Sequence, residues 1–97
     1  MRIIHWNKLA KLDYLENINY LLEKWSEKEA QDFVDEVFEI EYLLIQGNAD
    51  FQDTDRVDIK RCVLRRQISL FYRIIDKNNI EFLRFWNTYQ NNNKLNL

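Results

Sequence analysis

The stretch IKRCVLRRQISLFYRIID, Ile59–Asp76, decides the fold. It contains two runs rich in the β-branched and aromatic residues that strands prefer, separated by Arg65–Gln67, which has the length of a hairpin loop. A third run of the same kind follows the polar segment Asp76–Asn79. The sequence therefore predicts a three-strand meander with strands at Val57–Leu64, Ile68–Ile75 and Ile80–Trp86.

Two helices precede the meander. In the first, large apolar residues recur at steps of three and four, which places them on one face of a helix; they are Leu9, Leu12, Leu15, Ile18, Leu22 and Trp25. Asn7 is the expected N-cap of this helix. In the second, Ser26 and Glu29 match a capping box, and Gly47 suits the left-handed residue that ends many helices. The short break at Trp25–Ser26 predicts an antiparallel helical hairpin.

A short apolar run at the front, Arg2–Trp6, is a candidate further strand. The expected order is β-α-α-β-β-β, an α+β fold in which the helical hairpin packs on one face of an antiparallel sheet. The length suits a single domain over residues 1–97, and we expect the Asn-rich tail from about residue 90 to be frayed.

The arginines of the meander are expected on the open face of this sheet. Side chains alternate along a strand, so packing the aliphatic face against the helices sends the other set to the opposite side. The predicted surface contains three arginines and three aromatic residues: Arg61, Phe71, Arg73, Phe82, Arg84 and Trp86. Arginines and aromatic rings dominate protein-binding hot spots and also suit nucleic acid. The alternative is a solvated face covered by long side chains.

Composition narrows the function classes. The net charge is −2, and the second helix is strongly acidic, which disfavours broad contact with a phosphate backbone. The single cysteine, Cys62, indicates a reducing compartment, and no run is long and apolar enough for a signal peptide or membrane span, so a cytoplasmic location is expected. No metal-ligand spacing and no glycine-rich phosphate loop are present. We therefore expect no cofactor and no metal.

Two segments carry a family resemblance. HWNKLAKLDYLENINYLLEKWSEKEAQDFVDEVFEIEYL, residues 5–43, looks like the helical hairpin of the RelE/ParE toxin superfamily, and ISLFYRIIDKNNIEFLRFWN, residues 68–87, resembles its closing hairpin. The resemblance implies the toxin of a type II toxin–antitoxin system, neutralised by a cognate antitoxin. Members of this superfamily either inhibit DNA gyrase or cleave messenger RNA on the ribosome, and the resemblance allows a homodimer or a toxin–antitoxin hetero-oligomer.

Departures from the family pattern bear on the activity. Ser69 stands where the ribonuclease branch commonly has a basic residue, and the closing segment Thr88–Asn92 lacks the arginine that often occurs there. Gyrase inhibition is therefore the first hypothesis, with messenger RNA cleavage and an inactive member that only binds its antitoxin as alternatives. For a ribonuclease, Tyr89 with Arg61 and Arg73 is the best catalytic set, with Arg84 as a further phosphate ligand.

Overall fold

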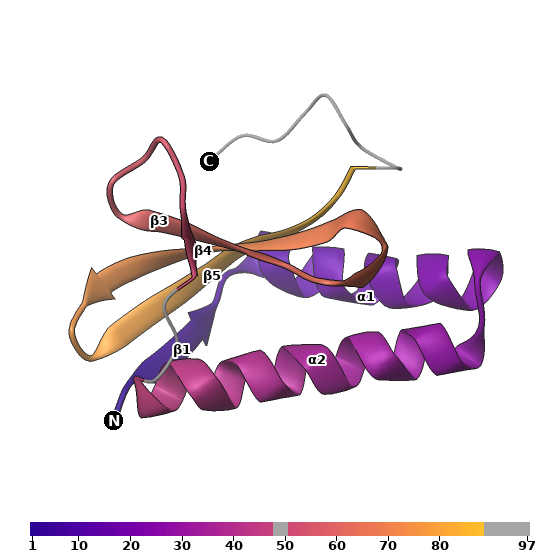
Figure 1. The fold of residues 1–97 in the computed structure, drawn as a ribbon, viewed down its shortest axis with the longest axis horizontal. Coiled ribbons are helices and arrows are strands. Elements are labelled where there is room, and N and C mark those ends of the chain that lie inside the picture. Colours follow the sequence, from indigo (N-terminus) through magenta and orange to yellow (C-terminus); the bar gives the residue numbers. More distant parts are fainter. Residues whose placement is uncertain (48–50, 89–97) are drawn as a thin grey trace.

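The computed structural model describes residues 1–47 and 51–88. Its elements are β1 (Ile3–Trp6), α1 (Lys8–Lys24), α2 (Glu27–Gln46), β2 (Gln52–Asp53), β3 (Ile59–Val63), the 3-10 helix η1 (Arg65–Gln67), β4 (Ile68–Asp76) and β5 (Asn79–Asn87). Both helices lie on the same side of the sheet (Figure 1). The predicted α+β fold and its element order are confirmed, with the short strand β2 added in what the sequence indicated to be a polar link.

The sheet has five strands in the order β1-β5-β4-β3-β2. The strands β3, β4 and β5 form the predicted antiparallel meander, and β2 adds to its outer edge by pairing Gln52 with Arg61. The pairing of β1 with β5 is parallel, so the sheet is mixed rather than wholly antiparallel. These two strands are distant in the sequence, and the helical hairpin between β1 and the meander frees β1 from the antiparallel direction that a tight turn imposes.

The helix ends follow local sequence signals. The Asn7 side chain accepts a hydrogen bond from the Ala10 amide at 2.8 Å, and Ser26 caps α2 through the Glu29 amide at 3.1 Å. Gly47 adopts the left-handed conformation with φ 75°, and its amide bonds back to the last turn of α2. All three capping predictions are confirmed, because each depends only on residues within one turn of the helix end.

The main core lies between the helices and the sheet. The apolar face of α2 packs there, with Phe33 and Leu44 fully buried. Aromatic rings from several elements meet around Phe85: Trp6 at 5.2 Å, Tyr14 at 5.7 Å and Phe33 at 6.1 Å between ring centroids. Edge-to-face and tilted contacts of this kind stabilise the junction of β1, α1, α2 and β5.

The orientation of α1 is a correction to the sequence analysis. Its large apolar residues are mostly exposed, and the helix instead buries Ala10, Asp13, Asn17 and Leu21. Leu15, for example, is 57% exposed. The reason is that α1 lies along the edge of β5, where small and polar side chains are needed, as the next subsection describes. The regular leucine spacing therefore marks the outer surface of α1 and not its packed face.

Candidate functional site

Strict strand alternation fails at one position of the predicted arginine and aromatic surface. The register between β4 and β5 shifts so that Phe71 lies opposite Arg84 but Tyr72 lies opposite Phe82, which makes Leu83 an extra residue on β5. A bulge of this kind moves the residues on either side of it out of simple alternation. Phe82 is therefore fully buried in the main core, and its predicted place on the open face was wrong. Leu83 takes the place on the opposite face.

The remaining aromatic residues of the predicted surface are not exposed either. Phe71 and Trp86 form a second apolar cluster with Ile59 and Leu83 on the sheet face away from the helices. Phe71 retains 8% and Trp86 7% of its accessible surface. These rings therefore act as a second small core, and the expectation of an aromatic surface open to a partner does not hold for them.

The three arginines lie on this same face, but two are paired with carboxylates. Arg73 has Asp58 at 3.4 Å and Glu81 at 3.5 Å, and Arg84 makes a two-pronged pair with Asp13 at 2.7 and 3.0 Å. A bidentate arginine–carboxylate pair leaves little guanidinium free for phosphate.

Arg61 differs from the other two arginines. Its Nε donates to the Ser69 hydroxyl at 3.2 Å, and its guanidinium carbon lies 5.9 Å from the Phe71 ring centroid. Among the described residues it has no carboxylate partner. Tyr89, the predicted proton-transfer group, lies outside the described residues, so the proposed catalytic set is not assembled in the described part of the chain.

Polar side chains of α1 complete the edge of β5 beyond the end of β1. The Phe85 amide donates to the Asp13 carboxylate at 3.1 Å, and Asn17 donates to the Phe85 carbonyl at 3.0 Å. One carboxylate and one amide, a helical turn apart, thus satisfy the backbone groups that a neighbouring strand would otherwise pair. The hydrogen bond that Arg84 donates to Asp13 also raises the pKa of the Arg84 guanidinium. Asp13 and Asn17 are four residues apart and so lie on one face of α1. That spacing was the available signal in the sequence, and it was missed.

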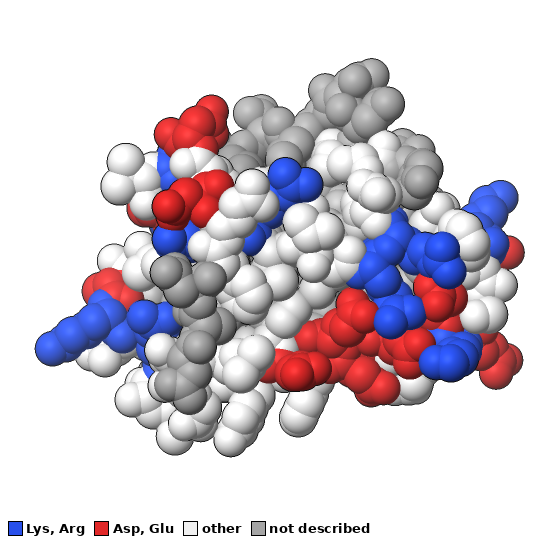
Figure 2. All heavy atoms as spheres, in the orientation of Figure 1, with Lys and Arg blue, Asp and Glu red and all other residues white. Residues whose placement is uncertain are grey.

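The arginines of the β3–β4 turn have a structural partner in α2. Arg65 contacts Glu29 at 2.8 Å, Asp32 at 3.3 Å and Glu36 at 2.7 Å. Figure 2 shows blue side chains meeting the red surface over α2. The hydrogen bond from Arg66 lowers the pKa of Glu29, and the hydrogen bond from Lys28 lowers that of Asp32. Much of the acidic face of α2 is therefore neutralised within the chain, which the sequence alone did not indicate.

Arg66 extends this contact to the helical turn. Its guanidinium carbon lies 3.7 Å from the ring centroid of Trp25, at the end of α1, and its Nε is 2.6 Å from Glu29. Arg66 and Gln67 both have positive φ, 55° and 63°, a backbone conformation that residues other than glycine rarely adopt. The ion pairs and the stacking hold this strained turn against the helical hairpin.

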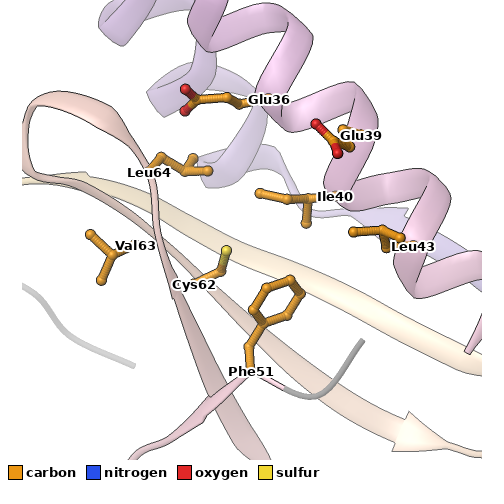
Figure 3. Close-up of a pocket in the computed structure, with 8 residues that line it drawn as sticks. All are labelled: Glu36, Glu39, Ile40, Leu43, Phe51, Cys62, Val63 and Leu64. Atoms are coloured by element: carbon orange, nitrogen blue, oxygen red, sulfur yellow. The ribbon is translucent and has the colours of Figure 1, made fainter. Parts of the chain in front are cut away.

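A groove lies between α2 and the outer edge of β3, with a volume of about 250 Å³. We call it the α2–β3 groove; its lining residues are Glu36, Glu39, Ile40, Leu43, Phe51, Cys62, Val63 and Leu64. Figure 3 shows apolar side chains of α2 and β3 facing one another across it, with the Phe51 ring at its lower end and the Val63 side chain pointing away. The burial of Cys62 raises its thiol pKa to about 11, so this group is an inert part of the wall.

Exposed apolar side chains also mark the outer surface of the helical hairpin. Phe38 is 72% exposed, and the others are Leu9, Leu12, Leu15, Leu22 and Tyr42. The residues described contain no group of three His, Cys, Asp or Glu side chains placed to hold a metal ion. No helix within the described ranges is long and apolar enough to cross a membrane.

Comparison with known proteins places this fold. No protein-family model matches the sequence, and no curated protein matches it either. Among solved structures, a chain of the chromosomal ParDE toxin–antitoxin system of P. aeruginosa is similar with a TM-score of 0.67 at 17% identity, over 87% of this chain and 92% of that one. A copper-bound mutant toxin from Helicobacter pylori is similar with a TM-score of 0.60 at 14% identity, over 94% of this chain and 99% of that one.

At these identities the likeness establishes the fold alone. The similarity extends over almost the full length of all three chains, so it concerns the whole domain and not one shared motif. This chain therefore has the fold of a ParDE toxin–antitoxin system chain and of an H. pylori toxin, which is the fold that the resemblance to RelE/ParE toxins implied.

Proposed function

We propose that the chain is the toxin of a type II toxin–antitoxin module, that it binds and inhibits a large target such as DNA gyrase, and that a cognate antitoxin neutralises it. The observation that carries the proposal is the full-length similarity to a ParDE system chain and to an H. pylori toxin, together with the resemblance of both hairpins to RelE/ParE toxins.

Inhibition by binding is preferred to RNA cleavage because of the arginine pairing. A ribonuclease needs cations that are free to stabilise the charge that develops on phosphate. Arg73 and Arg84 are instead engaged by the carboxylates of Asp58, Glu81 and Asp13. Arg61 is the arginine of this face that we expect to contact the target, because it has no carboxylate partner in the described part of the chain.

An antitoxin partner is supported by a different feature. Monomeric proteins rarely expose many large apolar side chains without a binding role. The helical hairpin exposes Leu12, Leu15 and Phe38 among others. We therefore expect the protein to be sparingly soluble alone and to be rescued by co-expression with the small protein encoded next to it.

The test is expression from an inducible promoter without any partner, followed by assays of the purified protein. We expect growth arrest, inhibition of gyrase supercoiling and no cleavage of messenger RNA on ribosomes. Arg61→Gln should weaken gyrase inhibition, while Lys77→Gln, the same loss of one charge in the exposed β4–β5 turn, should not. Unimpaired growth would contradict the toxin proposal. Cleavage of messenger RNA that Tyr89→Phe abolishes would replace gyrase inhibition with the ribonuclease alternative.

A further inference from the structure

We propose that the α2–β3 groove is the docking site for a lysine- or arginine-rich segment of the antitoxin, which inserts an apolar side chain into the groove. That this partner is the antitoxin rests on the proposed function. The kind of segment follows from two properties of the groove: its apolar wall and the carboxylates at its rim.

The wall of the groove is apolar and suits one side chain. Across the groove, two α2 side chains face two from the β3 side, and Phe51 closes one end (Figure 3); the facing side chains are Ile40 and Leu43, and Cys62 and Leu64. Its volume of about 250 Å³ is below the range of roughly 300–1,000 Å³ typical of small-molecule pockets. A cofactor or nucleotide would therefore be poorly enclosed, whereas an aliphatic or aromatic anchor residue of a peptide would bury most of its surface.

The rim of the groove is acidic, and one of its carboxylates is unpaired. Glu36 is held by Arg65 at 2.7 Å, whereas Glu39, one turn further along α2, is exposed and has no ion-pair partner within residues 1–47 and 51–88. A carboxylate beside an apolar groove favours a cationic residue flanking the anchor, because opposite charge raises both the association rate and the specificity of docking. Both features point to a basic segment with an apolar residue between its charges.

The first test uses synthetic peptides, so it does not depend on toxin activity. The probes are fluorescein-Lys-Val-Lys-Leu-Lys-Val-Lys-amide and the same labelled peptide with glutamate in place of lysine, measured by fluorescence anisotropy at low and high salt. We expect the basic peptide to bind, and its affinity to fall as salt is raised. Its affinity for Glu39→Lys should be about two- to fivefold lower, the size expected from one exposed ion pair. Glu39→Lys should bind the acidic peptide better than the unchanged protein does.

Two further variants separate charge from shape. Glu23→Lys makes the same change in net charge on α1, outside the groove, and should leave basic-peptide affinity unchanged. Leu43→Ser should lower the affinity for the basic peptide at high salt as well as at low salt, because it removes an apolar contact of the groove and no charge. Circular dichroism melts of each variant report whether it remains folded. Equal affinity of the two peptides, no binding, or equal losses for Glu39→Lys and Glu23→Lys would overturn the proposal.

The second test joins the groove to the antitoxin in cells. Glu39→Lys should still arrest growth when expressed alone, but co-expression of the neighbouring small protein should neutralise it less than it neutralises Glu23→Lys. If the unchanged protein does not arrest growth, the proposed function fails while the peptide result stands. If both variants arrest growth and are neutralised equally, the groove is not the antitoxin site and the toxin proposal survives.

Discussion

Removing the buried Asp13 carboxylate should strongly destabilise the fold. Asp13→Ala deletes both hydrogen bonds to the Arg84 guanidinium and the acceptor of the Phe85 amide. Breaking a buried ion pair by removing one partner costs about 3–5 kcal/mol. The Arg84 side chain retains 18% and the Asp13 side chain 11% exposure, so part of the stranded charge can be hydrated by water.

With that discount we expect the lost pair to contribute about 2–3 kcal/mol, and the orphaned amide about 1 kcal/mol more. The free energy of unfolding should therefore fall by about 3–4 kcal/mol, out of the roughly 5–15 kcal/mol typical of a domain. For a domain of this length that corresponds to a melting temperature lower by roughly 12–30 °C.

The assay is equilibrium urea unfolding followed by tryptophan fluorescence and circular dichroism. Glu23→Ala, an exposed acidic residue of the same helix, is the matched control and should change the free energy of unfolding by less than about 0.5 kcal/mol. In an Arg84→Met background, Asp13→Ala should cost about 1–3 kcal/mol less than it does alone, because the charge it would strand is already gone. A loss below about 1 kcal/mol for Asp13→Ala would refute the edge-sealing role of Asp13, and additive effects of the two changes would refute its coupling to Arg84.

Three further outcomes are expected. The pKa of Glu29 is lower in the folded chain, so its contribution to the free energy of unfolding is complete above the unfolded pKa near 4.5 and is lost as pH falls through the folded pKa. The free energy of unfolding should therefore fall less steeply with acid for Glu29→Gln than for Glu27→Gln. Cys62, with its pKa raised to about 11, should react with iodoacetamide at pH 8 far more slowly in the folded than in the urea-unfolded protein. Gly47→Ala should lower the free energy of unfolding by about 1 kcal/mol from backbone strain, because the described residues beyond its chain neighbours and its own helix place no atom within 4 Å of the added Cβ. Gln46→Ala should not lower it. Equal slopes, equal alkylation rates or a neutral Gly47→Ala would contradict these respective arguments.

The features that could be predicted from the sequence are those decided by neighbouring residues. Asn7, Ser26 and Gly47 cap their helices because a cap involves one turn of chain, and the β4–β5 hairpin forms around a short polar loop. The order of elements follows from these local signals together with the apolar face of α2.

The errors occurred where a distant element overrides a local pattern. Phe82 and Leu83 exchange faces because β5 carries one residue more than β4 opposite the bulge, and simple alternation cannot reveal that. Arg65 and Arg66 are drawn to α2 by acidic residues about 30 positions earlier in the sequence, so they belong to the scaffold and not to an open face. Of the predicted surface, the side on which the arginines lie was right, but the exposure of its aromatic rings was not.

The orientation of α1 connects the edge of the sheet to the exposed apolar surface of the helical hairpin. Because β1 ends at Trp6, the rest of β5 has an edge that must be covered, and α1 covers it with Asp13 and Asn17 in place of leucines. A helix that places polar groups inward leaves its large apolar residues outward, so the exposed leucines follow directly from how the edge is sealed. Rotating α1 to bury them would strand the Phe85 backbone and the Arg84 charge. The fold therefore keeps an apolar outer surface on the helical hairpin, and the proposed antitoxin partner is expected to cover it.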